Sequence, residues 1–252
     1  MKRRYGRLEK TSAFLRSSLF WLVFAGSTVL YGATLWMLAL FPYERRFRII
    51  LTWSRLNVWV LEKVCGVRYR VEGRENLPKD RAAIAVGNHQ STWETLALSF
   101  ILPPQVWVLK KQLLRIPFFG WGLAMSKPIA IDRSAGKSAR QQVIEKGRER
   151  LQEGLWVVIF PEGTRVHPGE VRRFKPGAAI LAEATGYPIV PIAHNAGLFW
   201  PRHQFIKYPG EITVSIGPPI DPAGLDREEI GARVETWIRR RMDELHGAAD
   251  DA

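Results

Sequence analysis

The stretch AAIAVGNHQSTWETLALSFIL, residues 82–102, changes its hydrophobic pattern halfway along. Its first part, AAIAVG, is a short apolar run typical of a buried strand, and its last part, TWETLALSFIL, is typical of an apolar helix. Between them, Asn88 suits a turn and Ser91 suits a helix N-cap. The stretch therefore predicts a strand that passes through a tight turn into a helix, the repeating unit of α/β folds.

The same alternation continues along the chain. Short β-rich runs are VRYRV (67–71), QVWVL (105–109), PIAI (128–131), LWVVIF (155–160), YPIVPIA (187–193) and EITVSIG (211–217). Helix-like stretches lie between most of them, the clearest at 135–154 and at 225–245, and the tail 247–252 is expected to fray. We predict an α/β fold with a mixed, largely parallel sheet covered by helices, in which binding sites collect where strand ends meet helix starts.

The N-terminal region is apolar enough to meet a membrane. No charged residue occurs from Ser17 to Tyr43, a length above the roughly 20 residues that cross a bilayer core. A cleaved signal peptide is the alternative, but the run exceeds an h-region of about 7 to 15 residues and lacks a small-x-small cleavage site. The following stretch carries only a few spaced charges and suits an amphipathic interfacial helix.

These patterns divide the chain into two parts. Residues 1–65 form an N-terminal membrane anchor, with an apolar helix at about 17–43 and an amphipathic helix at about 47–65. Residues 66–252 form the remaining domain. Basic clusters flank the apolar run on both sides, so two arrangements of the anchor stay open: one spans the bilayer, and the other dips into one leaflet.

Charge and cysteine content narrow the class of protein. A formal net charge of +13 and a pI of about 10.2 indicate an anionic partner, which could be nucleic acid, anionic lipid or a phosphorylated substrate. Nucleic acid is not expected, because the basic residues are dispersed and no reader motif is present. The single cysteine, Cys65, excludes an internal disulfide and the usual zinc spacings, so we expect no metal site and a cytosol-facing protein.

His89 and Glu94 are a candidate catalytic pair. They are five positions apart, which corresponds to about 140° around a helix, so they can meet only if His89 lies in the turn before the helix. A carboxylate that fixes one imidazole nitrogen allows the other nitrogen to take a proton from an alcohol. The alternative is a capping box, S-T-W-E, in which Ser91 and Glu94 satisfy backbone N–H groups at the helix start.

A second motif, FPEGTR at 160–165, is a candidate anion-binding loop. It follows the apolar run LWVVIF, and it contains a glycine that permits close backbone approach and an arginine whose planar fork suits a phosphate. A proline-glycine turn with a surface arginine is the alternative. Arg133 in IDR and Lys175 in RRFKPG are further basic candidates.

Taken together, these motifs resemble the glycerolipid acyltransferase family, and within it the bacterial 1-acyl-sn-glycerol-3-phosphate acyltransferases. The resemblance spans about Val67 to Gly217 and is carried in order by NHQSTWE (88–94), LLRIPFFGWGLAMSKPIAIDR (113–133), FPEGTR (160–165) and YPIVPIAHNAG (187–197). The family pattern is His-x4-Asp, so Glu94 is a departure whose longer side chain must retract to reach the imidazole. A branch of the family that is similar to this sequence around WETLAL has Glu at that position.

The resemblance implies an O-acyltransferase that makes phosphatidate. His89 would be the general base on the 2-hydroxyl of lysophosphatidate, Glu94 would orient it, and the acyl donor would be a thioester, either acyl-CoA or acyl carrier protein. The phosphate-binding residues implied by the resemblance are Glu162, Gly163, Thr164 and Arg165, helped by Arg133 and Lys127. No cofactor or metal is implied. The oxyanion donor would be a backbone N–H near the helix start, and His194 is an alternative base for which the resemblance favours a structural or substrate-contacting role.

The resemblance also implies a place and leaves alternatives. The substrate resides in a bilayer, so we expect the bacterial cytoplasmic membrane, with the catalytic domain on its cytosolic face and membrane lipid as a partner. A different acceptor, such as glycerol 3-phosphate or another lysolipid, would use the same motifs. A catalytically silent lipid-binding scaffold is the reading from another class of protein.

Overall fold

The computed structural model describes residues 7–132 and 136–250. The strands are β1 (Val67–Glu72), β2 (Ile84–Gly87), β3 (Gln105–Lys110), β4 (Ile129–Ile131), β5 (Trp156–Ile159), β6 (Ile189–His194) and β7 (Gly210–Ile216). The α-helices are α1 (Arg7–Met37), α2 (Tyr43–Cys65), α3 (Trp93–Ile101), α4 (Phe119–Ala124), α5 (Lys137–Gln152), α6 (Gly177–Thr185) and α7 (Arg227–Asp250). Short 3-10 helices are η1 (Arg74–Asn76), η2 (Lys111–Arg115) and η4 (Ala196–Leu198). Every predicted strand is present.

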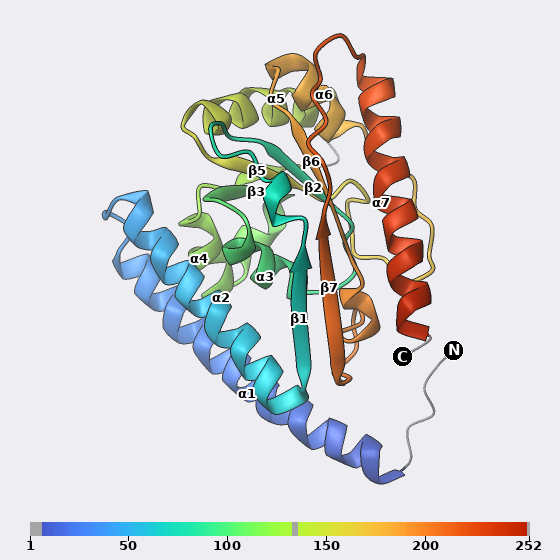
Figure 1. Cartoon of the computed structure of the whole chain (residues 1–252). Coiled ribbons are helices and arrows are strands. Elements are labelled where there is room, and N and C mark those ends of the chain that lie inside the picture. The colour runs from blue at the N-terminus through green and yellow to red at the C-terminus, as the bar shows by residue number, and fades with distance from the viewer. Residues whose placement is uncertain (1–6, 133–135, 251–252) are drawn as a thin grey trace.

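The strands form one mixed sheet in the order β1-β7-β6-β2-β5-β3-β4. All neighbouring pairs are parallel except β6 with β7. Helices α5, α6 and α7 cover one face, and α2 and α3 cover the other, with α1 outside α2 (Figure 1). Because both faces are covered, every residue of β2, β5 and β6 is buried. The predicted α/β class is confirmed.

The parallel strands bring several loops to one edge of the sheet. β6, β2, β5 and β3 are adjacent and run in the same direction, so their carboxyl ends meet at that edge. The segments that begin there start at Asn88, Phe160, Asn195 and Lys111. Residues far apart in the sequence can therefore share one site.

Helices α1 and α2 form an antiparallel pair beside the sheet (Figure 1). The sequence predicts the first helix at about 17–43, whereas α1 begins at Arg7 and ends at Met37. The helix does not reach Tyr43, because Pro42 disfavours helical geometry in the residue before it and serves as the N-cap of α2. Gly66 ends α2 in the left-handed region with φ 71°, and its N–H donates to the carbonyl of Glu62.

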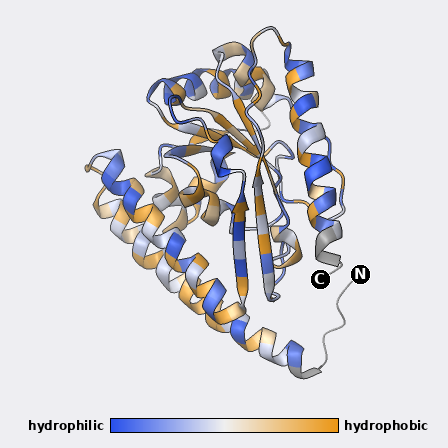
Figure 2. Ribbon diagram, in the orientation of Figure 1, coloured by the Kyte–Doolittle hydropathy of each residue, from blue (hydrophilic) through white to orange (hydrophobic). Residues whose placement is uncertain are grey.

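A buried polar contact joins the two helices. The side-chain amide of Asn57 on α2 donates to Ser27 Oγ on α1 over 3.2 Å, and Trp53 Nε1 donates to the same oxygen over 3.2 Å. In the described part of the chain, α1 is the one helix long and apolar enough to cross a bilayer, over Glu9–Met37. Apolar residues line both helices (Figure 2). The exposed side of α1 includes Leu22, Leu30 and Trp36.

The last helix is longer than the sequence predicts. The expected end is Leu245 with a frayed tail from Gly247, but α7 continues through Asp250. No proline follows Leu245, and Ala248 and Ala249 favour helix strongly enough to offset Gly247. Ile230, Val234 and Ile238 of α7 are buried, as the predicted apolar face requires.

Candidate functional site

A cavity of about 370 Å³ opens at the carboxyl edge of the sheet and extends between the helices on one side. Its apolar part is lined by residues of α1, α2, α3 and α4, with strand β3 and its flanks, among them Phe24, Tyr31, Leu35, Ile50, Trp53, Leu96, Trp107, Phe118 and Leu123. Its polar part is lined by His89, Thr92, Lys110, Gly163, Thr164, Arg165, Arg202 and His203. The cavity thus joins an apolar compartment to a cationic one beside a histidine.

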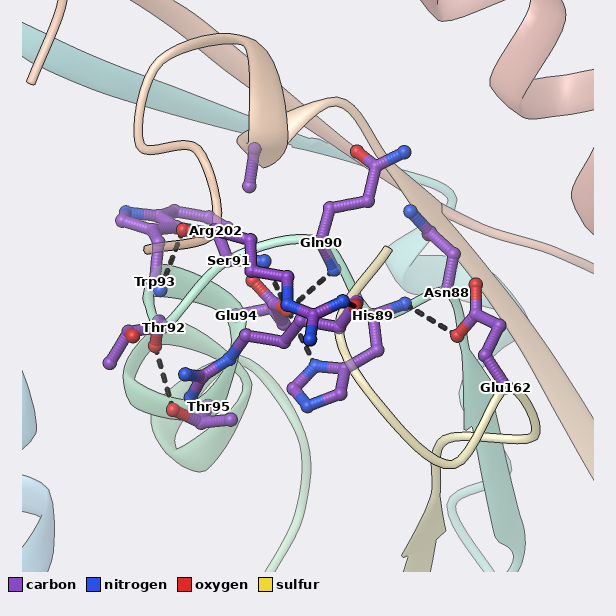
Figure 3. A network of polar contacts seen from close by, with 12 residues as sticks. Asn88, His89, Gln90, Ser91, Thr92, Trp93, Glu94, Thr95, Glu162 and Arg202 are labelled. Carbon is purple, nitrogen blue, oxygen red and sulfur yellow. Dashed lines mark hydrogen bonds and ion pairs between the residues drawn. The ribbon is translucent and has the colours of Figure 1, made fainter. Parts of the chain in front are cut away.

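His89 lies in the turn before α3, so its side chain can face that of Glu94. Its Nδ1 is 2.8 Å from Glu94 Oε1, and the two groups point toward each other in Figure 3. The imidazole is 15% exposed, while the carboxylate is fully buried. Nε2 of His89 forms no hydrogen bond with a described residue, and the ring lines the cavity. The pair can therefore present an unoccupied nitrogen to a bound molecule.

Glu94 also holds the turn. Its Oε1 accepts hydrogen bonds from the backbone N–H of Gln90 (3.0 Å) and of Ser91 (2.8 Å), and Ser91 Oγ accepts one from Trp93 N–H (3.1 Å). Carboxylate capping and the contact with His89 therefore coexist at one oxygen atom. The two alternatives raised by the sequence are compatible, because the turn that the cap stabilises is the turn that carries the histidine.

The imidazole is held on its other sides as well. Its ring stacks on Phe160, with 4.1 Å between centroids and 7° between planes. The backbone N–H of His89 donates to Glu162 Oε2 over 2.8 Å, and its carbonyl accepts from Val166 N–H over 2.8 Å. These contacts tie the loop after β2 to the loop after β5 and leave the ring little rotational freedom.

The charge state of Glu94 suits a partner of imidazole. Burial favours the neutral acid, but His194, His89 and the N–H of Ser91 outweigh it and lower the pKa of Glu94. An ionised carboxylate selects the tautomer of His89 in which Nδ1 carries the proton. Nε2 is then the basic nitrogen.

Glu162 differs from its predicted role in phosphate binding. Its side chain is 3% exposed and does not line the cavity; it binds the backbone N–H of His89 instead. Burial raises the pKa of Glu162 to about 8. The hydrogen bond donated by His89 N–H lowers this pKa, and the negative charge of Glu94 raises it. Near neutral pH Glu162 is therefore a neutral acid that holds the histidine turn.

We expect Glu162→Gln to make stability less dependent on pH. The folded protein keeps a proton up to about pH 8, whereas the unfolded chain releases it near pH 4.5. The free energy of unfolding should therefore fall as pH rises between these values, by on the order of 3 kcal/mol at pH 7. Glutamine keeps the acceptor for His89 N–H and does not titrate.

Denaturant unfolding in detergent at pH 5, 6.5 and 8 measures this effect. The advantage of the variant over wild type should grow with pH, whereas the exposed Glu75→Gln should follow wild type throughout. Parallel pH curves for wild type and Glu162→Gln would show that Glu162 ionises normally in the folded protein.

The other residues of the 160–165 loop do face the cavity. Gly163, Thr164 and Arg165 all line it. Gly163 adopts φ 73°, and a Cβ there would lie 3.0 Å from Lys175 Nζ, so glycine is required both for the turn and for the approach of the lysine. Arg165 is half-buried, and its Nε forms no hydrogen bond with a described residue. The loop thus presents one cation, Arg165, to the cavity.

Of the two helpers from the second motif, Lys127 does not join this group. Lys127 does not line the cavity; its Nζ pairs with Glu153 over 2.9 Å and lies over the ring of Tyr43. The structure places it before β4, at the edge where the parallel strands begin and away from the edge where the cavity opens. Arg133 lies outside the described residues.

His194 is committed to the fold. It is fully buried, its Nε2 lies 2.8 Å from the carbonyl of Asn88, and its Nδ1 accepts from Ala196 N–H over 3.3 Å. Burial lowers the pKa of His194, against the attraction of Glu94. It does not line the cavity, so the structural role is the one its contacts support.

Sequence reasoning missed Arg202, His203 and Lys110, which line the polar part of the cavity. Lys110 ends β3, and the other two lie in the loop that follows β6. The sequence could have indicated these residues, because each follows or ends a strand of the parallel set, and the carboxyl ends of parallel strands meet at one edge of the sheet. Among the described residues, no group of histidine, cysteine, aspartate and glutamate side chains is arranged to hold a metal ion.

Comparison with known proteins agrees with this geometry. The profile of the family described as Acyltransferase matches residues 68–195. The chain is 42% identical to a 1-acyl-sn-glycerol-3-phosphate acyltransferase of Pseudomonas aeruginosa over 92% of this chain and 91% of the relative. It is 33% identical to a protein of the same name from Saccharomyces cerevisiae, over 92% of this chain and 77% of the relative.

A solved structure is similar over almost the whole chain. It is the crystal structure of the 1-acyl-sn-glycerophosphate acyltransferase PlsC from Thermotoga maritima, with a TM-score of 0.79 and 26% sequence identity. The match covers 94% of this chain and 97% of that one, so it includes the α1 and α2 pair as well as the sheet.

Proposed function

The chain belongs to the acyltransferase family and is an O-acyltransferase, and we propose that it transfers a fatty acyl group from an acyl thioester to the 2-hydroxyl of lysophosphatidate. The names of its relatives support this acceptor. Acyl-CoA and acyl carrier protein are the two candidate donors. The product would be phosphatidate, the central intermediate of phospholipid biosynthesis.

One observation carries the proposal: a basic nitrogen and a cationic loop share a single cavity. His89 follows β2, and Arg165 follows the neighbouring parallel strand β5. Val166 N–H donates to the carbonyl of His89 over 2.8 Å, so the two loops are in direct contact. A glycerol phosphate can place its hydroxyl at His89 and its phosphate at Arg165 only in such an arrangement.

The chemistry follows from these positions. Nε2 of His89 takes the proton of the acceptor hydroxyl as its oxygen attacks the thioester carbonyl, and Glu94 stabilises the imidazolium that forms. Collapse of the tetrahedral intermediate breaks the C–S bond, and the imidazolium returns the proton to the leaving thiolate. The N–H groups of Gln90, Ser91 and Trp93 are bonded within the turn, which leaves that of Thr92 as the candidate oxyanion donor.

The apolar part of the cavity suits a fatty acyl chain. It runs from His89 between α1 and α4, past Gly32 and Gly122, which let the two helices pack closely because a Cβ on Gly32 would clash with the backbone of Phe118. A chain bound there would place its carbonyl carbon beside the imidazole while water is excluded. The contribution of α1 to this wall means that the anchor would also be part of the substrate site.

The anchor fits a substrate that resides in lipid. The apolar exposed side of α1 and the net charge of +13 favour binding at an anionic bilayer surface. We propose residues 1–65 as the anchor, residues 66–252 as the catalytic domain, and the cytosolic face of the bacterial inner membrane as the location.

A matrix of acceptors and donors tests the function. Purified protein in detergent should acylate lysophosphatidate, and the comparison acceptors are glycerol 3-phosphate and lysophosphatidylcholine, each with acyl-CoA and with acyl carrier protein. Preference for another acceptor would replace lysophosphatidate as the substrate. Vesicle binding without any acylated product would favour the scaffold reading.

Arg165→Met should weaken acceptor binding selectively. Loss of a charge-assisted contact to phosphate should raise KM for lysophosphatidate on the order of 10- to 100-fold, because such contacts contribute about 1.5–3 kcal/mol. Arg165→Lys keeps the charge but not the planar fork, so its KM for lysophosphatidate should lie between those of wild type and Arg165→Met. KM for the acyl donor should stay within about twofold of wild type, since the donor's thioester end is held elsewhere. An unchanged acceptor KM would remove Arg165 from the phosphate site.

A further inference from the structure

The loop from Asn195 to Pro209 connects β6 to β7 and crosses the edge of the sheet where the cavity opens. Two of its residues, Arg202 and His203, line the cavity. Arg202 Nη1 donates to the backbone carbonyl of Arg165 over 2.5 Å. Two arginines from loops after separate strands thus face the same space, although the family profile ends at residue 195 and does not reach Arg202.

The charges of these two arginines are not neutralised within the protein. Neither Arg165 nor Arg202 forms an ion pair with a carboxylate among the described residues. Burial lowers the pKa of Arg165, and the nearby charge of Arg202 lowers it further, against the attraction of Glu94. Two half-buried cations that line the same cavity are unfavourable without an anion. A phosphate offers enough oxygens to accept from both guanidinium forks.

A buried lysine secures the same loop from the other side. Lys207 is 1% exposed, and its ammonium is surrounded by aromatic rings of α1 and of the loop. The distances from Nζ to the ring centroids are 3.7 Å for Trp21, 4.8 Å for Trp200, 5.4 Å for Phe20 and 5.7 Å for Phe205. We call Lys207 and these four rings the aromatic clamp. Each such cation–π contact stabilises the position of the ammonium.

Hydrogen bonds reinforce the clamp. Lys207 Nζ donates to the carbonyl of Phe205 over 2.7 Å, and Lys207 N–H donates to Ser17 Oγ of α1 over 2.9 Å. Trp21 Nε1 donates to that same carbonyl of Phe205 over 3.1 Å. The loop is therefore attached to α1 through both backbone and side chain, three to five residues beyond Arg202.

The loop backbone is strained where it meets the cavity. His203 adopts φ 57°, which non-glycine residues rarely do. Such a conformation persists only when its surroundings impose it. The aromatic clamp on one side and the contact with Arg165 on the other supply that constraint, so the position of Arg202 is imposed by the fold.

We propose that Arg202 is a second arginine of the acceptor phosphate site and that the aromatic clamp positions it there by fastening its loop to α1. The identity of the anion as the phosphate of lysophosphatidate rests on the proposed function. Arg202 touches the substrate, whereas Lys207 acts through Arg202. The headgroup site is then complete only while α1 is docked on the domain.

Arg202 is tested by acceptor kinetics. Arg202→Met should raise KM for lysophosphatidate on the order of tenfold or more while kcat changes by less than about threefold. Arg202→Lys should recover part of the loss. The exposed Arg233→Met on α7, which removes an arginine paired with Glu229, is the matched control. If wild type acylates lysophosphatidate and Arg202→Met leaves KM unchanged, this inference fails and the proposed function stands. Absence of turnover by wild type refutes the proposed function instead.

The clamp is tested by a double-mutant cycle with Lys207→Met. Burial lowers the pKa of Lys207 to about 7, so assays at about pH 6 compare the variant with the charged form. Lys207→Met alone should raise KM for lysophosphatidate about threefold to tenfold. In the Arg202→Met background, the same substitution should raise KM further by less than about twofold. Equal effects in both backgrounds would reduce Lys207 to a general structural role. The exposed Lys146→Met on α5 is the control.

A milder change covers the case in which Lys207→Met does not fold. Phe205→Leu removes one ring of the clamp that is 44% exposed, so the core is spared. It should raise KM for lysophosphatidate in the wild-type background and not in the Arg202→Met background. The same increase in both backgrounds would contradict the positioning role.

Discussion

His89→Ala should lower kcat by about 10²- to 10⁴-fold, the range that a positioned general base contributes. The imidazole faces the cavity with Nε2 free of hydrogen bonds to described residues, while Glu94 fixes its Nδ1. Without it, the acceptor hydroxyl must lose its proton to water, because no positioned base takes it. KM for both substrates should change little, because alanine removes no contact to the phosphate or to the acyl chain.

Folding of this variant can be checked independently. The backbone of residue 89 keeps its bonds to Glu162 and Val166, and the lost stacking on Phe160 affects a partly exposed ring. Thermal unfolding in detergent should therefore stay close to that of wild type. A folded variant with wild-type turnover would show that another group is the base.

Glu94→Gln is expected to have the second largest effect, a decrease in kcat of about 10²- to 10³-fold. The amide oxygen can still accept from the N–H groups of Gln90 and Ser91, so the turn and the start of α3 should persist. What is lost is the negative charge that stabilises the imidazolium and selects the tautomer of His89. Glutamine therefore separates the electrostatic role of Glu94 from its role as a helix cap.

Two further substitutions sharpen this test. Glu94→Asp keeps the charge and should retain more activity than Glu94→Gln, in keeping with the aspartate of the family pattern. Glu94→Ala leaves three buried donors without their acceptor, so it should unfold more easily by about 1–3 kcal/mol per unsatisfied group. Near-normal kcat in folded Glu94→Gln would mean that Glu94 only caps the helix.

The local part of the site could be predicted because it is built from short-range structure. The change of pattern at residues 82–102 placed His89 in a turn, and that turn is the condition for its contact with Glu94. Arg165 was found in the same way, from a loop directly after an apolar strand. In both cases a few consecutive residues contain the information.

The wrong and missing assignments depend on long-range structure. Lys127 belongs to a motif in the sequence, yet its nearest partner is Glu153, twenty-six positions away. Glu162 sits in the predicted loop, but its side chain turns inward to the backbone of His89. Arg202 reaches the site only because β6 and β5 flank β2 in the sheet. None of these directions is encoded within one segment.

The amino-acid sequence by itself determined the alternation of strands and helices, the apolar N-terminal region and the two motifs that carry His89 and Arg165, because hydrophobic period and turn chemistry act over a few residues. Only the tertiary structure decided which cations share the cavity and that α1 forms part of its wall. Strand order and helix docking minimise exposed apolar surface over the whole chain, so they bring together residues that no local pattern relates.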